Sequence, residues 1–197
     1  MAAGGAFGFV ALLFLEHFLR QDLDPVSRPI SDYGRGELSW IFSASLLALA
    51  ASKAVVGLAL LRAEPPHARP AGAILLVDAF ATVLVALAPT DLGPTRTSTG
   101  RIHVLAATAA FLSSTAALVW ASGTMRAAGG VGWALRALAG ASALSLVTFT
   151  FSIVWGEWVG VHERVHVLVT AAWLTLFAFA RMDEAGERPT STSLGRS

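Results

Sequence analysis

The sequence has no cysteine and few charged residues. Of its 197 residues, 14% are charged and 55% are apolar, whereas a typical soluble domain has about 25% charged and roughly 45–50% apolar residues. The absence of cysteine excludes disulfides, thiolate nucleophiles and cysteine-bound metals or clusters. The formal net charge is only +1 and no basic run is present, so nothing in the composition indicates a nucleic-acid partner.

The apolar residues are concentrated in runs that approach the ~20 residues needed to cross a bilayer core. We identify six such runs, at about 3–19, 39–61, 71–89, 102–121, 131–154 and 161–180. Lipid offers the backbone no hydrogen-bond partners, so spanning segments form helices or closed barrels, and Leu- and Ala-rich runs of this length favour helices. The sequence therefore predicts an all-α integral membrane bundle of six transmembrane helices over residues 1–181, followed by a polar disordered tail over 182–197.

Six spans place both termini on the same side of the membrane. That side carries seven arginines and the opposite side six, which favours a plasma-membrane protein with both termini inside. The inner connections look like plain linkers, whereas the outer ones are rich in polar groups: "DLDPVSRPISDYGRGELSW", "APTDLGPTRTSTGRIH" and "WGEWVGVHERVH". We expect these three segments to meet at one outward-facing polar cavity, which is where a functional site is most easily built.

The same segments carry a resemblance to a known family. "LRQDLDPVSRPISDYGRGELSW", "LAPTD" followed by "TSTGRIH", and an arginine near the start of the last helix resemble a bacterial and archaeal multi-pass membrane family catalogued as domain of unknown function 998. The resemblance covers nearly the whole chain and implies six helices, with no known activity. Its motifs fall on Asp24, Pro25, Ser27, Arg28, Ser31, Gly34, Trp40, Pro89, Thr90, Asp91, Gly100, His103 and Arg164.

Two histidines in "HERVH" indicate a metal site. His162 and His166 are spaced i, i+4, so both project from one helix face, and zinc binds such pairs. His103 is the third candidate ligand, and Asp91 or Glu157 completes a four-ligand shell. The segment is also similar in position to the zinc-binding HxxxH of seven-pass membrane hydrolases related to alkaline ceramidases and adiponectin receptors. The alternative is that the histidines cap helix ends at the headgroup boundary and bind lipid phosphates.

Glu163 and Arg164 lie in the first turn of the last predicted helix. The helix dipole favours a glutamate there but disfavours an arginine, so Arg164 needs a partner. One interpretation is a planar clamp for a lipid phosphate or carboxylate. The other is a structural ion pair that ties the last loop to "ISDYG" or "PTD".

Ser31 and Asp32 lie in a tight segment between Pro29 and Gly34. Ser31 is a candidate nucleophile with His103 as its base, although the sequence has no G-x-S-x-G motif. The alternative is an interfacial turn in which Ser31 or Asp32 caps a short helix.

Further candidates lie near the outer interface. Glu16 is one turn from the outer end of the first span and is either an acid or base in a dry pocket or a partly exposed interfacial group. Trp155 and Trp158 flank Glu157 and are candidates for the wall of an apolar pocket, although interfacial tryptophans are common in membrane proteins.

Lys53 and Asp78 are the charged residues well inside the predicted bilayer. Their spans are antiparallel neighbours, so both residues fall at nearly the same depth. We interpret them as an ion pair that locks two helices; the alternative is a proton relay or the floor of a pocket.

The hypothesis that unites these features is a membrane enzyme acting on a lipid or isoprenoid-like substrate by zinc-assisted hydrolysis. The alternatives are a metal-free isomerase or cyclase, a small-molecule or proton-coupled transporter, and a non-catalytic scaffold. Membrane lipids are the expected partners, and the sequence is compatible with an oligomer of this chain. The candidate catalytic residues are Glu16, Ser31, Asp91, His103, Glu157 and Arg164; the candidate substrate-binding residues are Arg28, Asp32, Trp155, Trp158 and Glu163; the candidate ligands are His103, His162 and His166.

Overall fold

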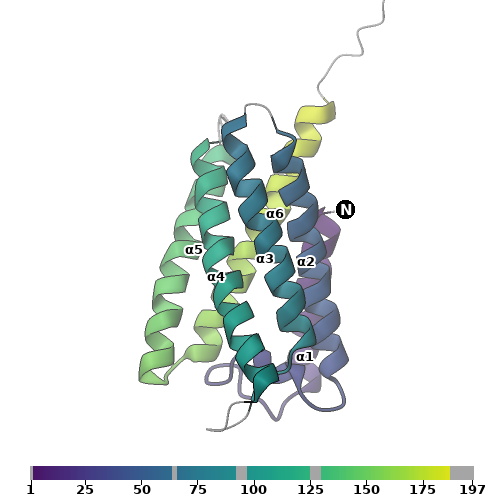
Figure 1. The fold of residues 1–197 in the computed structure, drawn as a ribbon, viewed down its shortest axis with the longest axis vertical. Coiled ribbons are helices and arrows are strands. Elements are labelled where there is room, and N and C mark those ends of the chain that lie inside the picture. The colour runs from purple at the N-terminus through teal and green to yellow at the C-terminus, as the bar shows by residue number, and fades with distance from the viewer. Residues whose placement is uncertain (1, 64–65, 92–96, 125–129, 187–197) are drawn as a thin grey trace, which may run out of the picture.

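The computed structural model describes residues 2–63, 66–91, 97–124 and 130–186, with side chains to residue 181. Six of the described helices are long and apolar enough to cross a membrane, which confirms the predicted all-α bundle. In chain order the elements are α1 (Ala2–Leu19), η1 (Ile30–Gly34), α2 (Ser39–Leu61), η2 (Pro66–Ala68), α3 (Arg69–Leu87), α4 (Ser98–Thr124), α5 (Gly130–Trp155) and α6 (Val159–Gly186) (Figure 1). Helix α6 thus extends into the predicted tail, of which residues 187–197 lie outside the described part.

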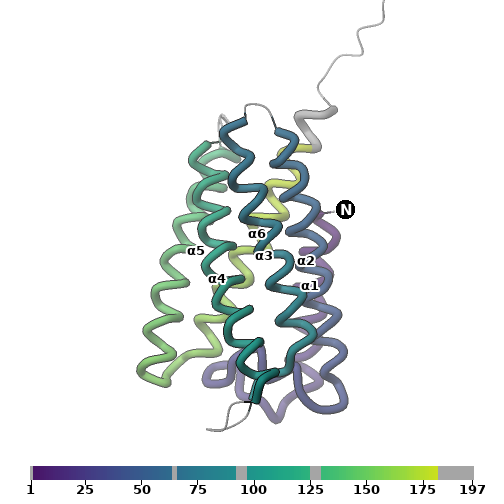
Figure 2. Tube along the Cα trace, viewed as in Figure 1, coloured from purple at the N-terminus to yellow at the C-terminus, as the bar shows by residue number. Residues whose placement is uncertain are grey.

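Each long helix packs against its neighbour in the sequence, and α6 also packs against α1, which closes the bundle. Helix α5 lies at one edge, and α6 runs behind α3 and α4 in the view of Figure 2. Trp173 and Leu174 of α6 are fully buried. The last helix therefore forms the centre of the apolar core, although its first turns carry the charged "HERVH".

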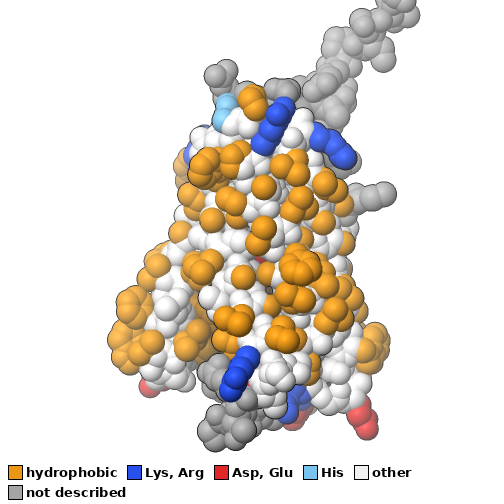
Figure 3. All heavy atoms as spheres, in the orientation of Figure 1, with side chains coloured by type: hydrophobic (Ala, Val, Ile, Leu, Met, Phe, Trp, Pro, Cys, Tyr) orange, Lys and Arg blue, Asp and Glu red, His pale blue; other side chains and the backbone are white. Residues whose placement is uncertain are grey.

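Side chains on the visible face are distributed as a membrane requires. Hydrophobic groups cover the body of the bundle, and the Lys, Arg, Asp and Glu side chains gather at its two ends (Figure 3). Large apolar residues such as Leu105 and Val154 are exposed on this body, where lipid tails would solvate them.

Helices α2 and α3 approach closely at two glycines. A Cβ atom built on Gly72 would lie 2.6 Å from the Gly57 carbonyl oxygen and 2.8 Å from the Leu61 nitrogen. Small residues allow such approach between membrane helices, where van der Waals packing drives association. The predicted Lys53–Asp78 ion pair joins the same two helices at 2.8 Å, so that expectation is confirmed.

We predict that Gly72→Ala destabilises the bundle, because the added methyl group meets backbone atoms that cannot rotate away. Overpacking of this kind costs about 1–3 kcal/mol, which thermal unfolding in detergent would detect. Gly140→Ala on α5 is the matched control, since nothing lies within 4 Å of its Cβ position. Equal melting temperatures for the two variants would contradict this account of the α2–α3 interface.

Candidate functional site

The helix ends that the three outer connections join lie at the same end of the bundle, at the bottom of Figure 1. The longest of them, between α1 and α2, carries η1, whose Ile30, Asp32 and Tyr33 are buried. A sequence of prolines and short polar residues would be expected to remain at the surface. Here the segment folds back onto the helix ends and covers them.

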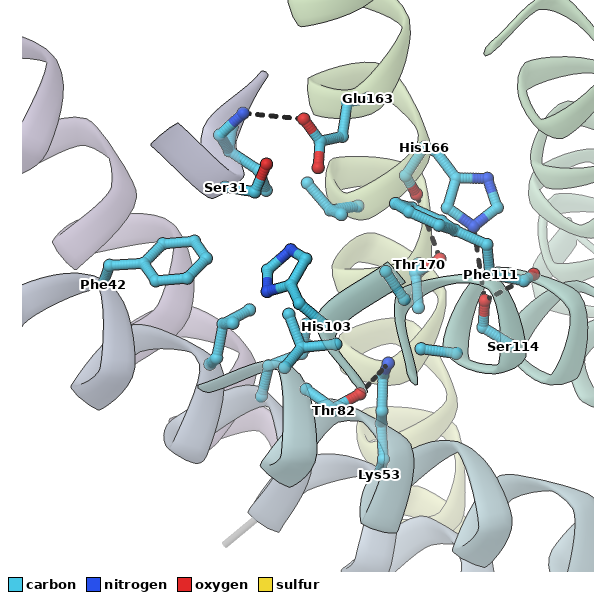
Figure 4. Close-up of a pocket in the computed structure, with 17 residues that line it drawn as sticks. Ser31, Phe42, Lys53, Thr82, His103, Phe111, Ser114, Glu163, His166 and Thr170 are labelled. Atoms are coloured by element: carbon cyan, nitrogen blue, oxygen red, sulfur yellow. Dashed lines mark hydrogen bonds between the residues drawn. The ribbon is translucent and has the colours of Figure 1, made fainter. Parts of the chain in front are cut away.

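A cavity of about 50 Å³ lies beneath η1, between α2, α3, α4 and α6 (Figure 4). This volume refers to space open to the centre of a water-sized molecule, so it exceeds the ~10–15 Å³ that one water requires. The wall is mainly apolar, with Phe42, Leu46, Leu49, Val85, Phe111 and Val167 among its members. The polar side chains in the wall are Ser31, Lys53, Thr82, His103, Ser114, Glu163, His166 and Thr170.

His103 points into the cavity from the first turns of α4 (Figure 4). Its Nδ1 lies 2.6 Å from the Ala88 carbonyl oxygen at the end of α3. A carbonyl oxygen only accepts hydrogen bonds, so Nδ1 carries the proton in that contact. The neutral ring therefore has its lone pair on Nε2, and the fold fixes one tautomer of a buried histidine.

Glu163 lies across the cavity from His103, at the start of α6. Its Oε2 accepts a hydrogen bond from the Ile30 backbone N–H at 2.6 Å, and the whole residue is buried. This contact holds the first residue of η1 above the cavity. Figure 4 shows the other carboxyl oxygen directed toward the cavity, on the same side as Ser31.

Arg164 points the opposite way from Glu163, into the α1–α2 connection. Its Nη1 donates to the carbonyl oxygens of Pro25, Arg28 and Gly160 at 2.8–2.9 Å. Its Nη2 donates to the Tyr33 hydroxyl at 3.0 Å.

The third nitrogen of this guanidinium, Nε, donates to His17 Nε2 at 2.8 Å. The described part of the chain places no carboxylate within ion-pair distance of Arg164. The predicted tie to "ISDYG" is therefore present, but carbonyls and a hydroxyl make it, not an acid. Because every nitrogen is occupied, the guanidinium is not arranged as an open clamp for a lipid phosphate.

Lys53, Asp78 and Thr82 form the floor of the cavity. Lys53 Nζ donates to Asp78 Oδ1 at 2.8 Å and to Thr82 Oγ1 at 2.9 Å. Lys53 and Thr82 line the cavity, whereas Asp78 is completely buried behind them. The pair thus locks two helices, as we interpreted it, and Lys53 also forms part of the pocket floor, which belonged to the alternative interpretation.

His166 is held between two serines on the α4–α5 side of α6. Its Nδ1 lies 3.0 Å from Ser145 Oγ and its Nε2 lies 3.3 Å from Ser114 Oγ. The ring also meets Phe111 edge-on, with 4.8 Å between centroids. Both ring nitrogens are therefore engaged by side chains that only the folded bundle brings together.

The predicted three-histidine metal site is not assembled. His162 is half-buried, and its Nδ1 lies 3.0 Å from the Trp158 carbonyl oxygen of its own helix turn. His166 turns to its serines and His103 to Ala88. Within the described ranges, no three His, Asp or Glu side chains form a group able to hold a metal ion.

Asp91 lies outside the cavity and shapes the start of α4. Its carboxylate accepts the Thr97 backbone N–H and hydroxyl, each at 2.8 Å. A Cβ atom on Gly100 would collide with that carboxylate, which explains the glycine. Asp91 also borders an open polar depression that includes Arg35 and Thr90.

The remaining outer candidates lie apart from the cavity. Trp155, Glu157 and Trp158 are exposed, and the first two border a shallow depression with His162. They do not wall the pocket, because the α5–α6 connection lies beside the bundle end and not over it.

Three further candidates lie on separate elements: Asp32 in η1, Arg28 in the connection before it, and Glu16 near the end of α1. Asp32 is buried, and its Oδ2 lies 3.7 Å from exposed Arg28; burial raises the pKa of the Asp32 carboxyl, while Arg28 and Arg35 oppose that rise. Glu16 is buried rather than partly exposed, and neither carboxyl oxygen has a hydrogen-bond partner among the described residues.

Thr82, Ser114 and Phe111 belong to the cavity wall but were not predicted from the sequence. A signal was present in α4, where His103, Ala107, Ala110 and Ser114 follow helical spacing and all line the cavity. Small and polar residues on one stripe of an apolar span indicate a face turned toward the protein interior.

Comparison with known proteins adds a family assignment. The family described as "Protein of unknown function (DUF998)" matches residues 2–180, so the chain belongs to this family of multi-pass membrane proteins. No curated protein and no solved structure matches the chain.

We predict that Arg164→Met destabilises the outer end of the bundle. The change removes five hydrogen bonds of a charged donor group, among them the buried bonds to Gly160 and Tyr33. Hydrogen bonds from charged groups contribute about 1.5–3 kcal/mol each, so the free energy of unfolding should fall by about 3 kcal/mol or more. Arg28→Met is the matched control, since the one side-chain contact of this exposed arginine among the described residues is the long one to Asp32, and such pairs contribute about 0–1 kcal/mol. Denaturant unfolding in detergent gives both values, and similar losses would sink the proposed role of Arg164.

Proposed function

We propose that this member of the DUF998 family is a membrane enzyme that acts on a lipid or isoprenoid-like substrate inside the cavity, by acid–base chemistry. The observation that carries the proposal is the fixed tautomer of His103. Its Nδ1–H is held by Ala88, and its ring points into a mainly apolar cavity (Figure 4). A buried histidine that keeps a free lone pair in the wall of a cavity has the arrangement of a general base.

Glu163 supplies the second group of an acid–base pair. It lines the same cavity as His103, and its Oε2 is fixed by the Ile30 N–H, which leaves Oε1 for a substrate. In an isomerisation or cyclisation, His103 Nε2 accepts a proton from one substrate atom and the Glu163 carboxyl delivers a proton to another. Such a reaction has no net gain or loss of protons, and the Ser31 hydroxyl is placed to orient the substrate.

Zinc-assisted hydrolysis is not part of this proposal. It needs three converging ligands, and His103, His162 and His166 face different neighbours, as described above. The supported version of the hypothesis is therefore the metal-free one.

A proton-coupled carrier is the second candidate, because the mid-membrane Lys53–Asp78 pair reaches the cavity through Lys53. Charges at this depth often mark ion or proton pathways. The two candidates differ in a direct readout, since an enzyme changes the chemical structure of its ligand and a carrier changes only its side of the membrane.

We predict that His103→Gln abolishes product formation while the protein still folds, because glutamine can keep the bond to Ala88 but has no basic lone pair. The loss should be about 100-fold or more. Proteoliposomes would be incubated with a total membrane lipid extract, and products would be identified by liquid chromatography–mass spectrometry. His67→Gln is the matched control, since His67 is exposed at the other end of the bundle. Identical products from wild type and a folded His103→Gln variant would refute the role of His103.

We further propose that the protein lies in the plasma membrane with both termini inside, as the arginine distribution favours. The cysteine-free chain allows a direct test with single introduced cysteines. Glu157→Cys should react with a membrane-impermeant maleimide on intact cells. Arg62→Cys should react only after permeabilisation; both side chains are exposed, at opposite ends of the bundle. The reverse pattern would invert the orientation.

A further inference from the structure

The floor of the cavity has one hydrogen-bond donor that the described residues leave open to a ligand. A lysine ammonium group has three N–H donors. The Lys53 ammonium gives one to Asp78 and one to Thr82. Since Lys53 lines the cavity and its ammonium rises from the floor in Figure 4, the third N–H is available to whatever occupies the cavity.

The charge balance of the floor decides what kind of acceptor fits there. Asp78 already pairs with Lys53 at 2.8 Å, and both side chains are at most 5% exposed. An added anion would be buried without a cation of its own, which is costly in a low-dielectric interior. A neutral oxygen accepts the same N–H and adds no charge.

The shape and lining of the cavity restrict the rest of the ligand. Leu46, Leu49, Val85 and Phe111 lie in the wall, and the accessible volume is about 50 Å³. A mostly apolar pocket with a few placed polar groups is typical of sites for small molecules. An anionic phospholipid headgroup does not match a wall this apolar, above a floor whose cation already pairs with Asp78.

We propose that Lys53 is the anchor of a subsite for the neutral hydroxyl or carbonyl oxygen of a small hydrocarbon ligand, such as a short isoprenoid alcohol or ketone. The oxygen lies at the Lys53 ammonium and the hydrocarbon lies along the apolar wall. This inference rests on the proposed function in one respect: the end of the ligand away from Lys53 is the end that reacts with His103 and Glu163. It narrows the substrate class from lipids in general to uncharged oxygenated hydrocarbons.

The test is direct binding of radiolabelled geraniol to the detergent-purified full chain, compared with geranic acid at pH 8. The two probes share a skeleton and differ in charge. Lys53→Met alone would leave Asp78 as a buried unpaired charge, so the informative variant is Lys53→Met/Asp78→Leu. Replacing both members of a buried ion pair with apolar residues is often neutral for stability. Ser52→Ala is the matched control, because Ser52 is buried one residue away and donates to the Ala2 carbonyl outside the cavity.

Wild type and Ser52→Ala should bind geraniol saturably and at least about tenfold more tightly than geranic acid. The folded double variant should lose about tenfold or more in geraniol affinity, as expected for a lost hydrogen bond from a charged donor. Unchanged affinity in the folded double variant, equal binding of geranic acid, or no saturable binding to wild type would each overturn the proposal. The His103→Gln variant separates the Lys53 subsite from the proposed reaction. If this variant binds geraniol but forms no lipid products, both the subsite and the role of His103 are supported. If it binds geraniol and forms the same lipid products as wild type, only the role of His103 is refuted.

Discussion

The outer end of this bundle depends on the guanidinium of Arg164. It joins α6 to α1 through His17 and to the α1–α2 connection through backbone carbonyls and Tyr33. Gly160 makes the approach possible, since a Cβ atom there would collide with the Arg28 and Pro25 carbonyl oxygens. Because Ile30 and Ser31 of the same connection line the cavity, the arginine that organises this connection also determines where the cavity ends.

The fold was predictable because lipid imposes one requirement on every span. Backbone groups must be satisfied within the segment, so the length and polarity of each run were enough to locate the six helices. The pairing of Lys53 with Asp78 was predicted from their nearly equal depth in two antiparallel neighbouring spans. The sequence also indicated that the outer segments carry the polar chemistry, and Ser31, His103, Glu163 and His166 do line one cavity.

The details of the site were not predictable because they depend on how each side chain turns after the helices pack. His162 and His166 share a helix face by spacing, yet one bonds to its own preceding turn and the other to Ser114 and Ser145. The sequence indicated Asp91 as a catalytic candidate, but its carboxylate accepts the Thr97 backbone N–H and so caps the start of α4. The helix dipole indicated that Arg164 needs an acidic partner. In the folded protein, backbone carbonyl oxygens of the α1–α2 connection accept its hydrogen bonds instead.

The Lys53–Asp78 pair is better explained by the cavity than by stability. Breaking a buried ion pair is costly, but an apolar pair in its place is often at least as stable. Helices α2 and α3 already pack closely at Gly57 and Gly72, so their association does not require charges. What an apolar pair would not supply is a hydrogen-bond donor fixed near the middle of the spanning helices and directed into the cavity. Asp78 and Thr82 hold that donor in place, while His103 and Glu163 belong to the first turns of α4 and α6 at the outer end of the bundle. The cavity therefore offers polar groups at two depths along a mainly apolar wall.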